Sequence, residues 1–170
     1  MSSLSGSNPA EEEPSLEHLS LSISQTEVNP PTVRVTLQNN HPSASFSVFK
    51  WDTPFDQNPL VLGVLSVRKK ATSEPVEVAR IMRNRKLPPG RDALLEVAPG
   101  AKTKTEVQLS SPIIQLEKGE KYEITAKGDW KAVWPLKADD ISDDELAKMG
   151  GSQTAKFGAF VSNEITLDVA

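Results

Sequence analysis

The chain has 170 residues, of which 37% are hydrophobic and 25% are charged, and this length suffices for one domain with one core. Its formal net charge of -4 at pH 7 provides no basic field that would attract nucleic acid or an anionic membrane, so neither is expected as a partner. The lack of cysteine excludes disulfides, thiolate metal ligands and cysteine nucleophiles.

The first segment, residues 1–15, is rich in Ser, Pro and Glu and predicts a disordered tail, because it cannot bury enough apolar surface to offset the entropy of ordering. A single domain is expected over residues 16–170. The tail lacks the apolar stretch of a signal peptide, and no apolar run reaches the roughly 18 residues of a membrane span. We therefore expect a cytoplasmic protein, with a secreted protein whose signal peptide has been removed as the alternative.

Alternation of apolar and polar residues with a period of two then predicts strands. The inward positions of the first two are Leu19, Leu21 and Ile23, followed by Val33, Val35 and Leu37. The segment Ser45–Trp51 has apolar residues on both faces, which is typical of a central strand in a two-layer structure. Further strands are expected at 60–67, 76–82, 103–109, 122–126 and 155–169. About eight strands separated by turns predict an all-β antiparallel sandwich of the Ig-like or prealbumin-like kind.

Two charged stretches need an interpretation of their own. The basic residues from Arg80 to Arg85, with Lys86, alternate with apolar residues, and a solvated strand face is favoured over an anion-binding patch. Residues 138–150 predict a short acidic helix, because Ser142 and Glu145 have the spacing of a capping box. The acids of this insert are Asp139, Asp140, Asp143, Asp144 and Glu145. They could ligate calcium, but they lack the alternate spacing and central Gly of a calcium loop, so helix capping is favoured.

The most informative stretch is Phe49–Asp56, where a strand ends in a Trp and continues into a loop that contains Pro, acids and another aromatic ring. Large rings in loops anchor protein partners because they bury much area at a low entropy cost, but they also plug the open ends of sandwiches. The candidate contact residues in this loop are Trp51, Asp52, Pro54, Phe55 and Asp56. Trp130 and Trp134 are expected in a second loop that flanks the first.

A succession of short motifs covers residues 33 to 134. It runs Val33-x-Val35-x-Leu37-x-Asn39-Asn40, Phe49-Lys50-Trp51-Asp52-Thr53-Pro54-Phe55-Asp56, Arg83-Asn84-Arg85, Leu95-x-Val97-Ala98-Pro99-Gly100 and Gly119-x-x-Tyr122-x-Ile124. In order and spacing it resembles the propeptide domain of the deuterolysin-type zinc metalloendopeptidases, which include peptidyl-Lys and neutral protease II enzymes, here without the catalytic domain. The resemblance implies a β-sandwich that assists the folding of a protease and keeps it latent.

Catalysis by this chain is not expected. A zinc peptidase of that kind needs two histidines and a glutamate in the form H-E-x-x-H, whereas the only histidines, His18 and His41, lie in separate segments. Neither has an evident partner for a serine triad, and both are interpreted as surface or strand-edge imidazoles. We expect no catalytic residue, no metal site and no cofactor.

The sequence therefore predicts a non-catalytic protein-interaction module that is monomeric or weakly homodimeric. Its expected partner is a protein, with a protease as the example that the resemblance implies, and the module would act as an inhibitor or a chaperone-like binder. The alternative is a sandwich that binds a carbohydrate or another small ligand through the same Trp-containing loops.

Overall fold

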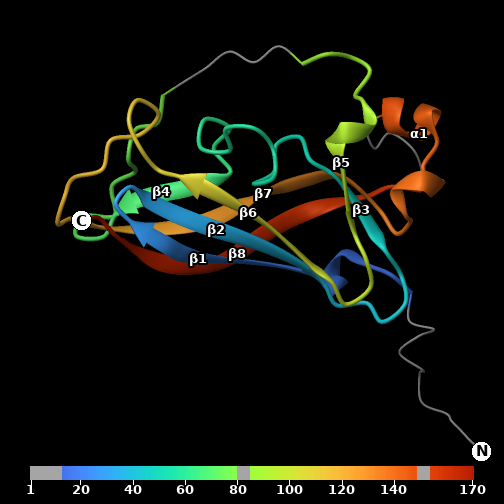
Figure 1. The fold of residues 1–170 in the computed structure, drawn as a ribbon, viewed down its shortest axis with the longest axis horizontal. Helices are drawn as coiled ribbons and strands as arrows, with labels where there is room; N and C mark the ends of the chain where they lie inside the picture. Colours follow the sequence, from blue (N-terminus) through green and yellow to red (C-terminus); the bar gives the residue numbers. More distant parts are fainter. Residues whose placement is uncertain (1–12, 80–84, 149–153) are drawn as a thin grey trace, which may run out of the picture.

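The computed structural model describes residues 13–79, 85–148 and 154–170, which form two antiparallel sheets packed face to face (Figure 1). One sheet has the strand order β1-β2-β6, and the other has the order β4-β7-β3-β5 with β8 paired to β7. The strands are β1 (Leu19–Val28), β2 (Pro31–Asn39), β3 (Phe46–Phe49), β4 (Leu65–Lys69), β5 (Leu94–Val97), β6 (Lys102–Gln108), β7 (Lys121–Trp134) and β8 (Lys156–Asp168). The predicted antiparallel all-β sandwich is confirmed. Most of the predicted tail, residues 1–12, lies outside the described residues.

The alternating residues of β2 form the centre of the smaller sheet and face the core. Val33, Val35 and Leu37 are completely buried, as the sequence predicts. Val35 pairs with Ile23 of β1 on one side and with Thr105 of β6 on the other. In the larger sheet all four residues of β3 are buried, because β5 and β7 flank the strand, so the prediction of a central strand here is confirmed.

Side-chain amides join the two sheets where β1 meets β8. The Ile23 N–H donates to Oδ1 of Asn163 at 2.8 Å, and Nδ2 of Asn163 donates to the Ile23 carbonyl at 3.1 Å. Gln25 makes a matching pair of bonds to Asp168. Its Nε2 donates to the Asp168 carbonyl at 2.7 Å, and its Oε1 accepts from the Asp168 N–H at 2.9 Å. Each amide takes the place of a neighbouring peptide group, so the backbone groups of Ile23 and Asp168 are bonded although the two strands form no ladder.

This junction gives a first testable prediction. Replacing Asn163 with alanine removes both bonds to Ile23, and we expect the free energy of unfolding to fall by about 1–2 kcal/mol. Urea unfolding followed by circular dichroism would measure the loss. Glu164→Ala, an exposed change at the next position, should stay within about 0.5 kcal/mol. Equal effects of the two substitutions would show that the amide is not a structural link.

Strand β7 is longer than the sequence predicts. The expected strand 122–126 continues to Trp134, because Gly128, which looks like a turn residue, lies inside the strand. A Cβ at Gly128 would come within 2.8 Å of the Phe160 ring, so the glycine makes room for an aromatic side chain of β8. The Phe160 and Trp130 rings then pack with their centroids 4.5 Å apart.

Two other strand predictions need correction. The apolar segment 60–64 is a turn, which has φ 77° at Gly63 and still buries Leu60, so an apolar run alone did not distinguish a buried turn from a strand. The segment 75–79 makes only isolated bridges, since Pro75 has no N–H to donate, and the rest of the predicted strand lies outside the described residues. Conversely, β5 forms at Leu94–Val97, where no strand is predicted.

The acidic insert forms a 3-10 turn, Ala138–Asp140, and a short helix, α1 (Asp143–Ala147). The predicted cap is confirmed, because Oγ of Ser142 accepts from the Glu145 N–H at 3.1 Å. Arg91 fastens the insert to the sandwich: its guanidinium donates to the carbonyls of Ala138 and Ile141 and to the Asp143 carboxylate. The helix is shorter than predicted, and the glycines at 150–151 lie outside the described residues.

Candidate functional site

The loop that follows β3 is built around one turn. The Thr53 hydroxyl donates to the Lys50 carbonyl at 2.7 Å and accepts from the Phe55 N–H at 3.1 Å. The Thr53 N–H donates to the same Lys50 carbonyl at 3.2 Å. Asp52 lies in the left-handed region with φ 61°, which Asp tolerates better than most residues do. These local bonds fix the backbone that carries the predicted contact residues.

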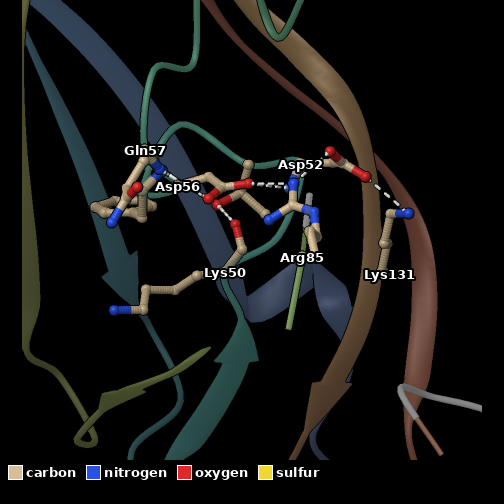
Figure 2. Close-up of polar contacts among 8 residues, drawn as sticks. Lys50, Asp52, Asp56, Gln57, Arg85 and Lys131 are labelled. Carbon is tan, nitrogen blue, oxygen red and sulfur yellow. Dashed lines mark hydrogen bonds and ion pairs between the residues drawn. The ribbon is translucent and has the colours of Figure 1, made fainter. Parts of the chain in front are cut away.

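A cluster of ion pairs joins Arg85 and Lys131 to the acids of this loop (Figure 2). Arg85 donates to Oδ2 of Asp56 at 2.7 Å and to Oδ1 of Asp52 at 3.1 Å. Lys131, from β7, binds the other oxygen of Asp52 at 2.7 Å. Asp56 also accepts from the Asp52 N–H at 2.9 Å and from the Gln57 N–H at 2.7 Å. Among the described residues, two cations thus bind the two carboxylates, and backbone N–H groups of the loop also bind Asp56.

These contacts set the protonation of the cluster. Only 6% of the Asp56 side chain is exposed, and burial by itself would raise the pKa of this carboxyl. Hydrogen bonds from Arg85 and from the backbone of Asp52 and Gln57 outweigh burial and bring the pKa of Asp56 below its ordinary value of 3.8. Burial would likewise lower the pKa of Arg85, but the two carboxylates raise it. Both groups are charged at neutral pH.

Beside this cluster lies an open cleft of about 520 Å³. Its lining residues are Lys50, Trp51, Phe55, Asp56, Gln57, Arg85, Lys86, Pro88, Gly90, Asp92 and Ala93. The Trp51 ring is half-buried, since the Arg85 guanidinium lies 4.5 Å from its centroid and the Phe49 ring packs 4.9 Å away. Trp51 and the half-buried Phe55 also line the cleft, so the structural interpretation of Trp51 holds and its role in binding stays a prediction.

The predicted second loop does not exist. Trp130 and Trp134 lie in β7 and are 4% and 0% exposed. Trp130 belongs to the core between the sheets, and Trp134 lies under the insert with Ile141 and Leu146. Their placement in a loop is therefore wrong, because the continuation of β7 draws both rings into the interior. Of the other five candidates, Trp51, Phe55 and Asp56 line the cleft, whereas Pro54 is buried and Asp52 binds the cations.

The sequence interpretation of Arg85 is also wrong. Arg85 does not lie on a solvated strand face. Only 20% of its side chain is exposed, and its guanidinium pairs with Asp52 and Asp56 of the loop. The rest of the basic stretch, 80–84, lies outside the described residues. Neither Arg85 nor Lys131 was recognised as a partner of the loop. A weak signal was present, since two acids four residues apart in an aromatic loop need cations once they are buried.

The two histidines lie together rather than at separate surfaces. Their ring centroids are 4.7 Å apart in an edge-to-face arrangement, and His41 is 1% exposed. Nδ1 of His41 accepts from the N–H groups of Ser43 and Ala44 at 3.1 and 2.9 Å, so this ring shapes the turn after β2. Among the described residues, no group of three or more His, Cys, Asp or Glu side chains could hold a metal ion. No helix in this part of the chain has the length and apolarity needed to cross a membrane.

Fold and site together define an antiparallel β-sandwich in which one ion-paired loop supports a cleft with aromatic and charged walls. A family model described as an immunoglobulin-like domain matches residues 18–169, and the chain belongs to this family. The chain is also 30% identical over 149 residues to an "Uncharacterized secreted protein" of Arthroderma benhamiae, with 82% of this chain and 75% of that protein covered. Neither description names a catalytic activity.

Proposed function

We propose that this domain is a non-catalytic module that binds a protein partner at the cleft beside the Trp51–Asp56 loop. Trp51 and Phe55 supply the apolar contacts, while Asp52, Pro54 and Asp56 hold the shape of the loop. The observation that carries the proposal is the cleft itself, whose aromatic walls are fixed before any partner arrives by the Thr53 turn and by Arg85. Groups that are ordered in advance lose less entropy on binding, which favours affinity.

The test is affinity capture from native extract with the wild type and the double variant Trp51→Ala, Phe55→Ala. The double variant should bind its partner at least about tenfold more weakly, because buried aromatic anchors carry a large share of interface energy. Phe157→Ala is the matched control, since this ring is 74% exposed on β8 and does not line the cleft. Thermal melts must show that both variants fold. Recovery of the same partners by the double variant would refute the proposed surface.

The place of action is part of the proposal. The relative from Arthroderma benhamiae is named a secreted protein, which supports the secreted alternative for this chain. The cytoplasmic expectation gains no support from the comparisons. Extracellular fluid of the producing organism is therefore the first extract in which to search for the partner.

The resemblance to deuterolysin propeptides remains a prediction, and it makes a zinc endopeptidase one candidate partner. Such an enzyme should lose activity on addition of the domain and keep it on addition of the double variant.

A cleft of about 520 Å³ also falls in the range of small-ligand sites, roughly 300–1,000 Å³, which favours the carbohydrate or small-ligand alternative as a second candidate. A glycan array on which the wild type binds and the double variant does not would favour that candidate.

A further inference from the structure

We infer that the partner presents to this cleft an acidic peptide segment that combines carboxylates with apolar side chains. The inference rests on the proposed function and specifies the chemistry of the partner. It follows from which charges of the cleft are already bound within the protein and which are not.

The charges of the cleft fall into two groups. Arg85 and Asp56 bind one another at 2.7 Å, and both are largely buried, so they contribute little net charge to a ligand. Lys50 and Lys86 form no ion pair among the described residues, although both line the cleft. One further acid, the exposed Asp92, also belongs to the described lining of the cleft. Among the described lining residues, two lysines and one aspartate therefore give an available charge of plus one, in a chain whose net charge is -4.

Hydrogen bonds hold the backbone of Lys50, whereas its ammonium group forms no ion pair among the described residues. Its N–H donates to the Ala93 carbonyl at 2.8 Å, and its carbonyl accepts from Thr53. Figure 2 shows the side chain extended away from the cluster of Asp56 and Arg85. A cation held in this way can bind an incoming carboxylate without breaking an existing ion pair, which avoids the cost of separating charges.

The lining of the cleft also contains aromatic residues, which favour apolar groups in a ligand. Trp51 and Phe55 are partly exposed residues that line the same cleft as the two lysines, so a ligand that combines carboxylates with apolar side chains can use both kinds of contact at once. A purely anionic ligand would leave the rings in water, and a basic peptide would meet Lys50 and Lys86 with like charge. The geometry therefore favours a mixed acidic and apolar segment over both.

The experiment is an NMR titration of the labelled domain with the capped peptide Glu-Leu-Glu-Glu-Leu-Glu and with counterparts in which Gln or Lys replaces Glu. We expect saturable shifts in the cleft with the acidic peptide, and binding at least about tenfold weaker with the Gln peptide. Binding should weaken as salt is raised, because the lysines are partly exposed. Absence of saturable shifts at millimolar acidic peptide, or equal binding of the three peptides, would overturn the inference.

Charge reversal separates this inference from the proposed function. Lys50→Glu, Lys86→Glu should abolish binding of the acidic peptide and recovery of the partner. The control Lys104→Glu, Lys118→Glu makes the same change in net charge at exposed positions outside this cleft. It should leave both peptide binding and recovery of the partner unchanged. If the partner is lost with the aromatic double variant but retained with the Lys50 and Lys86 reversal, the proposed function stands and the acidic segment is refuted. If both variants retain the partner, both proposals fail.

Discussion

Replacing Asn39 with alanine is expected to lower the free energy of unfolding by about 3 kcal/mol. Asn39 is completely buried at the end of β2. Its Oδ1 accepts from the His41 N–H at 2.9 Å, and its Nδ2 donates to the carbonyls of Ala44 and Val97 at 2.8 and 3.0 Å. Alanine would leave three backbone groups without their partner in the interior, where each unsatisfied group costs roughly 1–3 kcal/mol.

Asn40→Ala is the matched control, because it makes the same chemical change one residue further along. Asn40 is exposed, and its side chain makes a single bond, to Ser20 at 3.2 Å. We expect a loss below about 0.5 kcal/mol for this variant. Chemical unfolding of both variants with two spectroscopic probes would measure the difference. A loss below about 1 kcal/mol for Asn39→Ala would mean that water replaces the amide.

Asn39 also illustrates what the sequence could predict and what it could not. Asn39 and Asn40 together correctly indicate the end of a strand. Nothing local distinguishes the buried amide from the exposed one, because the bond to Val97 joins residues 58 positions apart. Alternation predicted the buried faces of β1 and β2, and the Ser142 cap predicted a helix, because these signals reside in neighbouring residues.

The candidate site was predicted in part for the same reason. Trp51 and Phe55 were recognised from composition and from their position after a strand. Arg85 was not, since it lies 33 residues from Asp52, and only the folded chain brings the two together. Trp130 was misplaced because Gly128 has the local signature of a turn, whereas its role is to accommodate the Phe160 ring. Non-local contacts therefore account for each error at the site.

The second large effect is expected from Arg85→Ala. This variant removes the Arg85 cation from Asp56, whose side chain is 6% exposed and whose other described donors include the backbone N–H groups of Asp52 and Gln57. We expect a loss of about 2 kcal/mol at neutral pH, because removing a cation that binds an almost buried carboxylate is strongly destabilising. Arg34→Ala is the control: its pair with Glu106 is exposed, at 41% and 49%, and should contribute less than about 1 kcal/mol.

The pH dependence of unfolding distinguishes the loss of an ion pair from a simple loss of packing. In the wild type the pKa of Asp56 is below its ordinary value, so this carboxylate stabilises the fold above the unfolded-state pKa of about 3.9, and the contribution disappears as pH falls through the lower, folded pKa. In Arg85→Ala the burial of Asp56 is opposed less strongly, so its folded-state pKa shifts upward and the variant loses less stability than the wild type as the pH falls. Melting temperatures measured from neutral to acidic pH would show the shift.

Adding Asp56→Asn to Arg85→Ala decides how the pair acts on the loop. Without a titrating group at position 56, the double variant should no longer show the change in pH dependence seen in Arg85→Ala. Its loss of unfolding free energy should be smaller than the sum of the losses of the two single variants by about 1–2 kcal/mol. Additive losses with an unchanged acid response would mean that Arg85 acts through its contact with the Trp51 ring. The Thr53 turn would then set the shape of the loop, and the cleft would keep its aromatic walls without the ion pair.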